Sequence, residues 1–525
     1  MKRLGGTDAL FLSMETPSWH QHVAGLTVLD PGDREVTFED VVKLIDERIV
    51  YAPKFRWKLQ EVPFGLDRPV WVDDPDFDVR RHMHRIAVPS PGGAKEVGEL
   101  AGNLASTQLD RRKPLWEIWF IEGLADGKLG LMMKYHHCLL DGMAGASLAT
   151  VLLDLEPDAP APMLPLPSDD ELYAGPEESG MQLLAETLRP DLNRPVRFAR
   201  YVAGLAAKGV AAIDSVRTDD ENRALLRAPM TPFNGTIGPR RELAFASVAL
   251  SDVQAVKKKH DVKVNDVVLA ICGGALRKYL EDLDAVPEAP LVTGVPVSTR
   301  PEGDTSHSNQ ITNMFVSMAT DVDDPVERLE AIQRSTASAK AMTKAIGARQ
   351  IQSIGEVATP LILSTAIRAV YRTQLMSKGP VRINTLVSNV PGPPIPLYMC
   401  GARITAIYPS SIILDGMGLN ITVISYEDRL DFGLHVDPDL VPDPWALAHH
   451  FEDALEELML ASGLGAPTPV EQPLPMTGAA AKPAKPAKKA PARKPTAKRA
   501  PAKKTPAKKA PAAKTTKATT KAKAS

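Results

Sequence analysis

Two runs of alternating apolar and polar residues, separated by a turn signal, form the clearest local pattern in the chain. Residues 116–123 and 129–135 favour β-strands, and Asp126-Gly127 between them favours a tight turn. We therefore predict a β-hairpin here. Strands and helices alternate beyond residue 240, with Ser251 as a predicted helix N-cap. The predicted strands are 243–250, 382–390, 420–426 and 430–436, and the predicted helices are 264–280 and 445–460.

Proline-rich stretches divide the chain into parts. Residues 157–178 combine repeated prolines with an acidic cluster, and we expect this composition to exclude a helix or an inner strand. A helical pattern follows at 181–216, interrupted at Pro190 and Pro195. The predicted parts are an N-terminal lobe (1–156), a Pro-rich crossover and helical linker (157–239), a C-terminal lobe (240–465) and a disordered basic tail (466–525).

Length and composition indicate a globular protein with more than one core. The chain has 525 residues, several times the usual length of a single domain. Its 44% apolar and 24% charged residues are typical of soluble globular proteins. The aromatic share of 5% gives no indication of a surface that stacks nucleic-acid bases.

Charge is distributed unevenly between the body and the tail. From Lys482 to Ser525 there are 16 Lys and Arg and no acidic residue, and the preceding 46 basic and 64 acidic residues give the body a formal charge of −18. The tail has no apolar face to bury, so we expect it to be disordered. One interpretation is an electrostatic tether to an anionic lipid surface or to nucleic acid, and the other is a solubilising tail with no specific partner.

The spacing of the cysteines and the length of the apolar runs indicate the cellular compartment. Cys138, Cys272 and Cys400 are widely separated, which predicts neither a disulfide framework nor a zinc site and fits a reducing cytoplasm. The N-terminus lacks the apolar region of a signal peptide, and no apolar stretch is long enough to span a bilayer. We therefore expect a cytoplasmic protein whose membrane or lipid-droplet contact is peripheral.

The leading candidates for chemistry are His136 and His137. They open the run His-His-Cys-Leu-Leu-Asp-Gly at 136–142, between the second hairpin strand and a helix predicted at 144–155. Alternation along a strand places the two side chains on opposite faces, so only one of them faces a given cavity. A histidine there can take a hydroxyl proton near neutral pH, because its ordinary pKa is about 6.5.

Other interpretations of the histidine pair were weighed against this one. A histidine beside apolar strand residues is often only a hydrogen-bonded core residue. His-x-x-x-Asp offers two metal ligands but no third with suitable spacing, so no metal is predicted. The sequence has no Gly-x-Ser-x-Gly elbow, phosphate loop or dinucleotide fingerprint, which excludes the common hydrolase, NTPase and dehydrogenase motifs.

The run at 136–142 resembles the His-His-x-x-x-Asp-Gly signature of the CoA-dependent acyltransferase superfamily. Three further segments resemble the bacterial wax ester synthase/diacylglycerol acyltransferase family: Pro-Leu-Trp at 114–116, Asn-Asp-Val-Val-Leu-Ala at 265–270, and Thr-Asp-Ala-Leu-Phe-Leu at 7–12 followed by His22-Val23. With similar segments at 296–300 and 388–393, the resemblance covers residues 1–465. The plant branch of the superfamily is disfavoured, because Asp-Phe-Gly at 431–433 does not continue as Trp-Gly.

The resemblance implies an α/β (α+β) fold of two chloramphenicol-acetyltransferase-like lobes, each a mixed sheet with helices, with a tunnel between them. It implies that His137 is the general base and that His136 supports its geometry. The proton taken from the acceptor hydroxyl would later pass to the CoA thiolate, without an acyl-enzyme. Acyl-CoA is then the co-substrate, and no bound cofactor is implied.

Five other residues receive expected roles alongside this resemblance. Asp141 is expected to be structural, with Arg300 as its candidate partner, and Gly142 lets the next helix begin close to the strand. Asn265 is a candidate donor to the tetrahedral oxyanion, with simple capping of a helix as the alternative. Asp266 is expected to anchor the start of that helix.

The leading hypothesis for function is transfer of a long-chain acyl group from acyl-CoA to diacylglycerol, giving triacylglycerol and CoA. Alternatives are wax ester synthesis with a fatty alcohol as acceptor, and acylation of a polyketide or glycolipid alcohol. A non-enzymatic alternative is a lipid- or nucleic-acid-binding protein that uses the basic tail. No specific nucleic acid is predicted as a partner, and the sequence does not separate the acceptor alcohols.

Overall fold

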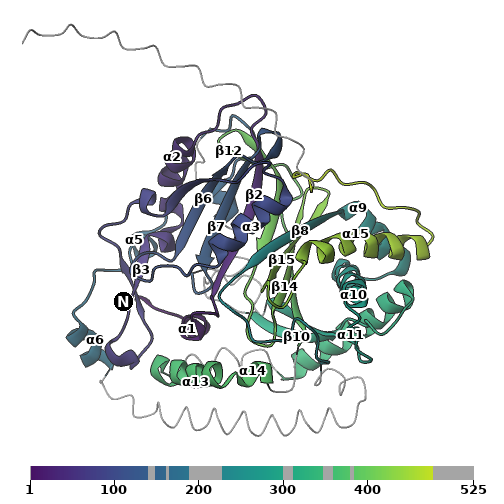
Figure 1. Cartoon of the computed structure of the whole chain (residues 1–525). Coiled ribbons are helices and arrows are strands. Elements are labelled where there is room, and N and C mark those ends of the chain that lie inside the picture. The colour runs from purple at the N-terminus through teal and green to yellow at the C-terminus, as the bar shows by residue number, and fades with distance from the viewer. Residues whose placement is uncertain are drawn as a thin grey trace, which may run out of the picture. The chain divides into compact units, whose positions relative to one another are not determined.

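The computed structural model describes residues 2–139, 148–160, 165–187, 228–298, 311–346, 359–378 and 383–476. In this part of the chain two six-stranded mixed sheets, one small three-stranded sheet and surrounding helices are present (Figure 1). The α/β class expected from the sequence is therefore confirmed. Residues beyond 476, which include the basic tail, lie outside the described part.

The first sheet is built around the predicted hairpin. The two strands of the hairpin pair antiparallel, with Trp116 opposite Tyr135, and Asp126 and Gly127 in the turn have φ angles of 59° and 74°. The prediction of the hairpin and its turn is confirmed. The strand order is β12 (Tyr398–Met399), β13 (Ala402–Ser410), β2 (His22–Asp30), β7 (Leu129–His136), β6 (Trp116–Glu122) and β5 (Met83–Ala87).

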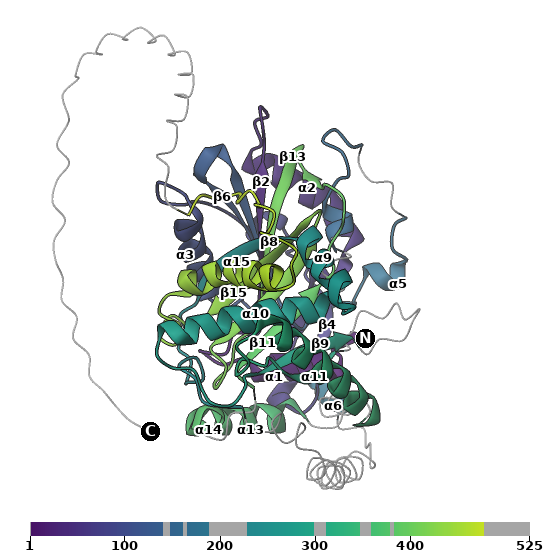
Figure 2. The same ribbon diagram turned by 90° about the vertical axis from the view of Figure 1, so that its right-hand side faces the viewer.

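The second sheet belongs to the C-terminal half, and its strands β8 (Glu242–Ala249), β14 (Leu419–Tyr426) and β15 (Arg429–Val436) are buried on both faces along most of their length. Helix α15 (Pro444–Ala461) packs on it, with α10 (Val264–Asp282) beside α15, and α9 (Leu250–His260) and α11 (Pro325–Ile346) follow (Figure 2). The strand order is β10 (Ile311–Ser317), β9 (Val292–Ser298), β11 (Thr385–Val390), β14, β15 and β8.

One segment of the C-terminal half crosses into the first sheet. β12 and β13, which the predicted boundaries place in the C-terminal lobe, complete the first sheet by pairing of β13 with β2. β13 also lies against β15, so closely that a Cβ on Gly433 would be 1.7 Å from the carbonyl oxygen of Pro409. Only glycine fits this crossing. The two lobes therefore share a strand and are not independent along the sequence.

Asp431, in the same Asp-Phe-Gly run, links the two sheets. Its carboxylate is fully buried and accepts hydrogen bonds from Ser247 Oγ at 2.6 Å, from Ile407 N at 2.9 Å, and from Nε and Nη2 of Arg429 at 3.2 and 3.1 Å. Ser247 lies on β8 and Ile407 on β13. The carboxylate therefore ties β15 to a strand of each sheet.

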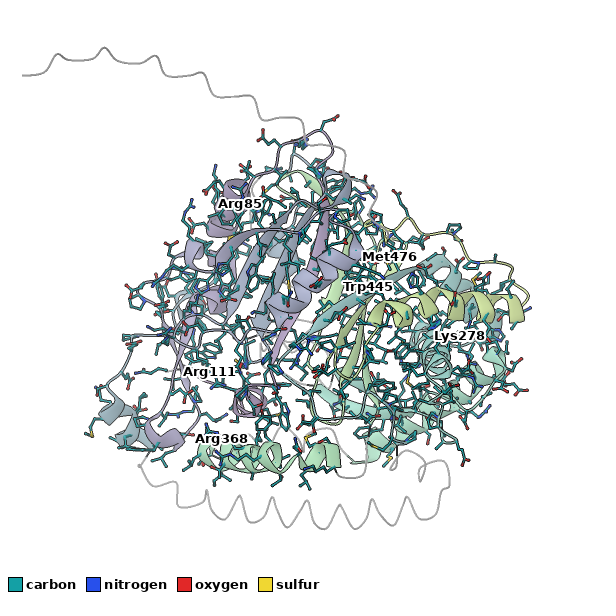
Figure 3. All side chains as sticks on the ribbon, viewed as in Figure 1. Arg85, Arg111, Lys278, Arg368, Trp445 and Met476 are labelled. Carbon is teal, nitrogen blue, oxygen red and sulfur yellow. The ribbon has the colours of Figure 1, made fainter. Side chains whose placement is uncertain are left out.

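Residues 466–476, which the predicted boundaries assign to the disordered tail, pack against the body of the chain, so this part of the prediction is wrong. Residues 466–476 run as a strap from α9 to α3 (Ala94–Ala105), with Thr468 Oγ1 donating to Asp252 at 3.0 Å and Pro475 O accepting from Ala94 N at 2.9 Å. Leu474 is buried, and Met476 lies near Trp445 in Figure 3. A few apolar side chains suffice to hold this strap, although its proline-rich composition resembles that of the tail.

Further predictions of local structure have mixed outcomes. Ser251 is not an N-cap, because α9 begins at Leu250 with Ala249 as its N-cap. The Pro-rich stretch does hold a one-turn helix, α5 (Asp169–Leu172), because Ser168 and Glu171 form a capping box. Of the helix predicted at 181–216 only α6 (Gly180–Thr187) is described, and of the helix at 144–155 the described part is helical at 148–152.

The N-terminal half also carries a smaller layer. Helix α1 (Gly6–Met14) lies between the sheets and the pair α13 (Pro360–Thr373) and α14 (Leu375–Lys378) (Figure 1). The small sheet has the order β1 (Lys2–Arg3), β4 (Val70–Asp73), β3 (Trp57–Gln60), and α2 (Phe38–Arg48) belongs to the same half of the chain. Among the described helices none is both long and apolar enough to cross a membrane.

Candidate active site

The backbone of the histidine pair is held by the two neighbours of β7. His136 ends β7, and its N–H donates to the carbonyl of Leu115 at 3.0 Å. The N–H of His137 donates to the carbonyl of Gln21, just before β2, at 2.8 Å. Leu115 belongs to the Pro-Leu-Trp run, and Trp116 anchors that run by donating from Nε1 to Phe55 O at 2.7 Å. Segments distant in sequence therefore fix the position of the pair.

The side chain of His136 is used inside the protein. It is 1% exposed, and its Nδ1 accepts from the backbone N–H of Cys138 at 3.1 Å, which leaves the proton on Nε2. Nε2 lies 4.0 Å from a carboxylate oxygen of Glu15, which Arg111 holds with two hydrogen bonds. Burial, with the Arg111 charge, holds the pKa of His136 well below its ordinary value. His136 is therefore neutral near pH 7.

The side chain of His137 has a different environment. It follows β7 in a turn, is half-buried, and stacks on the ring of Phe11 with centroids 4.1 Å apart and planes inclined by 8°. Phe11 lies on α1, within the run at 7–12. Offset or stacked aromatic pairs fix ring orientation at a gain of about 0.5–1.5 kcal/mol. Helix α1 therefore sets the plane of the His137 ring.

A buried polar cluster lies between the lobes beside the pair. His22 is opposite His136 in the pairing of β2 with β7, and its Nε2 contacts the carbonyl of Ala105 at 2.8 Å. His435 Nδ1 contacts Ser410 Oγ at 2.6 Å, which joins β15 to β13. Arg241 is 4% exposed and donates to backbone carbonyls, including that of Ser18. Burial lowers the pKa of Arg241 to about 10.

Sequence reasoning missed two residues that meet the pair, Phe11 and Gln21. Gln21 is fully buried, and its side-chain amide makes no hydrogen bond to any described residue. An unsatisfied buried amide costs about 1–3 kcal/mol, so it is expected to complete its bonds with a bound molecule or water. The available signal was that Phe11 lies in, and Gln21 next to, segments that carried the family resemblance.

Asn265 lies in the first turn of α10, on the other half of the molecule. The N-cap of this helix is Lys263, whose N–H donates to Asp266 Oδ2 at 3.0 Å, and Asp266 Oδ1 accepts from Thr336 at 2.8 Å. Asp266 therefore anchors the helix start, as expected. Asn265 is half-buried and is the second residue of α10, so it is not the N-cap of this helix.

Three of the predicted residues are not part of the described chain. Asp141, Gly142 and Arg300 lie in the gaps at 140–147 and 299–310, so the predicted pairing of Asp141 with Arg300 stays a prediction. For metals, the described residues contain no group of three or more His, Cys, Asp or Glu placed to hold an ion.

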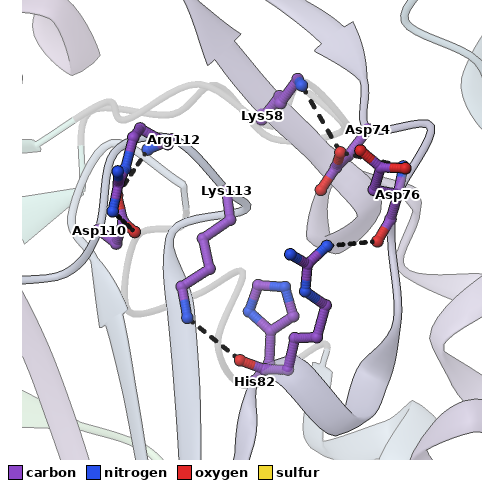
Figure 4. A pocket seen from close by; sticks show the side chains of 8 residues that line it. Lys58, Asp74, Asp76, His82, Asp110, Arg112 and Lys113 are labelled. Carbon is purple, nitrogen blue, oxygen red and sulfur yellow. Dashed lines mark hydrogen bonds and ion pairs between the residues drawn. The ribbon is translucent and has the colours of Figure 1, made fainter. Parts of the chain in front are cut away.

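A separate polar pocket of about 310 Å³ lies on the first lobe (Figure 4). Several of its charged side chains form ion pairs with one another. Lys58 pairs with Asp74 at 3.6 Å, and Arg112 pairs with Asp110 at 2.9 Å. One of its lining residues, His82, stacks on Trp116 with ring centroids 4.5 Å apart, and Phe55 packs edge-on against the same tryptophan. The internal ion pairing indicates a structural role for this pocket.

Comparisons with known proteins identify the family to which most of the chain is similar. Residues 4–268 match the family described as wax ester synthase/diacylglycerol acyltransferase catalytic domain, and residues 307–459 match its C-terminal domain. The chain is 38% identical over 467 residues to a protein of Mycobacterium tuberculosis named as a diacylglycerol O-acyltransferase, covering 88% of this chain and 91% of that protein. A second relative from the same organism, with a name of the same kind, is 33% identical, covering 87% and 98%.

Solved structures give the same picture. A wax ester synthase/diacylglycerol acyltransferase from Marinobacter aquaeolei VT8 is 30% identical with a TM-score of 0.63, covering 88% of this chain and all of that one. A trichothecene 15-O-acetyltransferase from Fusarium sporotrichioides, 12% identical with a TM-score of 0.56 and covering 88% and 94%, shares the fold. The chain therefore belongs to the wax ester synthase/diacylglycerol acyltransferase family, whose members are acyltransferases.

Proposed function

We propose that this enzyme transfers a long-chain acyl group from acyl-CoA to the free hydroxyl of diacylglycerol, with His137 as the general base. The observation that carries the proposal is the contrast between the two histidines. His136 has its Nδ1 occupied by Cys138 N–H and is fully buried, whereas His137 is half-buried and oriented by Phe11. A base must reach the proton that it abstracts, and of the pair only His137 has exposed surface.

The reaction follows from a base at this position. His137 takes the proton of the acceptor hydroxyl while the oxygen attacks the thioester carbonyl, forming a tetrahedral oxyanion. Collapse of this intermediate breaks the carbon–sulfur bond, and His137 returns the proton to the CoA thiolate, leaving triacylglycerol and CoA. The base contributes about 10²- to 10⁴-fold and the positioning of both substrates about 7–11 kcal/mol.

Two amides are proposed to serve the oxyanion or the substrates. Gln21, whose side-chain amide has no hydrogen-bond partner among the described residues, directly precedes the strand that flanks His136, and Asn265 lies in the first turn of α10. One well-placed amide donor is worth about 2.7–4 kcal/mol at an oxyanion. His136 would support the turn, and Asp141 and Gly142 would shape the loop that follows.

A fatty alcohol is the second candidate acceptor, because the matched family and the Marinobacter structure carry wax ester synthase in their names. Purified full-length protein with labelled long-chain acyl-CoA, assayed against diacylglycerol and a fatty alcohol in parallel, decides between them. Formation of triacylglycerol as the main product is expected. No ester product with either alcohol would refute the proposal.

The role of His137 is tested by His137→Ala, with His449→Ala on the surface of α15 as a matched control. We expect the site variant to lose about 10²- to 10⁴-fold in kcat at unchanged thermal stability, and the control to retain turnover. Full turnover by His137→Ala would exclude this residue as the base.

A further inference from the structure

Helices α13 and α14 expose an unusual number of apolar side chains. Leu361 and Ile362 in the first turn of α13 are 48% and 50% exposed, and Leu375 and Met376 of α14 are 61% and 42% exposed. Phe64 lies beside these residues, because a Cβ on its neighbour Gly65 would be 3.4 Å from Leu361. Phe64 itself is 77% exposed. Apolar side chains gathered on one face mark an interaction surface.

The same face carries positive charge only. From Pro360 to Lys378 the sequence contains Arg368, Arg372 and Lys378, all exposed, and no acidic residue. Arg368 is labelled in Figure 3. The body of the chain has the opposite sign, with a formal charge of −18. A helix with exposed apolar residues and cations, on an otherwise acidic body, fits an anionic lipid surface better than another acidic protein surface.

The opposite side of α13 leads directly to the histidine pair. Its inner residues pack around Trp19, with Tyr371 edge-on to Trp19 at 5.6 Å and Tyr371 OH 3.2 Å from Ser18 Oγ. α13 also packs on α1, whose Phe11 stacks on His137. The inner side of α13 is therefore connected to the proposed base through α1.

We propose that the α13 face, defined as Phe64, Leu361, Ile362, Arg368, Arg372, Leu375, Met376 and Lys378, docks the enzyme on an anionic membrane surface from which the lipid alcohol enters. The proposal rests on the proposed function for the identity of the substrate, because diacylglycerol is insoluble and resides in lipid. The apolar residues insert at the level of the headgroups, and the cations contact lipid phosphates.

A polarity-sensitive dye tests contact of this face with lipid. The dye is attached to full-length Leu361→Cys in a Cys400→Ser background, since Cys138 and Cys272 are buried, and Leu155→Cys on another face is the matched control. With phosphatidylglycerol-containing vesicles we expect a blue shift at position 361 and none at 155. Protein that sediments with vesicles without a shift at 361 would overturn the proposal, because the basic tail would then be the only anchor.

A charge variant provides the second measurement. Arg368→Glu with Arg372→Glu is expected to weaken the dye-reported vesicle binding about tenfold or more at low salt, while Lys258→Glu with Lys259→Glu on α9 leaves it unchanged. Turnover of vesicle-borne diacylglycerol should fall in parallel, and turnover of a short soluble alcohol should not. Equal binding of both double variants would overturn the proposal.

Two other outcomes would show a contact between two copies of the chain at this face or a failure of the proposed function. A dimeric mass in sedimentation, lost in the α13 charge variant, would show that the face joins two copies of the chain and would overturn the lipid proposal. Absence of turnover with every alcohol would refute the proposed function, and the dye shift would still decide whether this face binds lipid.

Discussion

Acidification is expected to destabilise this protein through histidines buried between the lobes. Burial and the nearby Arg241 lower the pKa of His20 to about 4, and burial holds the pKa values of His22 and His435 well below their ordinary value. In the unfolded chain such groups titrate near pH 6.5. Between pH 6.5 and 4 the unfolded chain therefore binds protons that the native protein does not, and stability falls as the pH falls.

The size of the effect follows from the shift of His20. With pKa values of about 6.5 unfolded and about 4 folded, lowering the pH from 7 to 5 removes about 2 kcal/mol of stability through this one residue. His22 and His435 act in the same direction. Total stabilities of about 5–15 kcal/mol are usual, so the cluster alone takes a sizeable part of the margin.

Urea unfolding of wild type and His20→Gln at pH 7 and pH 5 measures this term. The glutamine amide can still donate to Pro17 O, which His20 Nε2 contacts at 2.9 Å, but it does not titrate. We expect the loss of stability between the two pH values to be about 2 kcal/mol smaller in the variant. His449→Gln, on the exposed face of α15, should behave as wild type. An unchanged loss in His20→Gln would refute the assignment of a low pKa to this histidine.

Two further predictions concern orientation and the joint between the lobes. Phe11→Leu removes the ring that stacks on His137, so kcat should fall about 2- to 10-fold with little change in KM; steady-state kinetics check this, and wild-type kcat would contradict it. Asp431→Asn places an amide where four hydrogen bonds converge on a carboxylate. Urea unfolding should show a free energy of unfolding lower by about 2–3 kcal/mol than that of wild type. An unchanged midpoint would exclude a linking role for Asp431.

The sequence predicted those elements whose pattern depends on a few consecutive residues. The hairpin at β6 and β7 depends on alternation and on a turn pair that accepts positive φ, and both are properties of a few consecutive residues. The prediction of Ser251 as an N-cap was wrong because its side chain bonds to a residue distant in sequence. Its hydroxyl and N–H bond to Asp428, which lies far away in sequence, and the helix starts one residue earlier.

Local patterns could not predict the strap at residues 466–476 or the pairing of the shared strand β13. Residues 466–476 resemble the tail in composition, and only their contacts with α9 and α3 separate them from it. β13 has an ordinary strand pattern, and nothing in it says that its partner is β2 and not a neighbour in its own half. Pairing partners are selected by long-range packing, which a window of sequence does not contain.

By itself the sequence determined the hairpin, the residue types of the histidine pair and the resemblance to a family. Only the tertiary structure decided how the two histidines differ, because Cys138 N–H occupies one ring while Phe11 orients the other. It also decided that Leu115 and Gln21 hold the pair by their carbonyl oxygens. A backbone carbonyl is present at every residue, so its use as a support is invisible until folding brings the strands together.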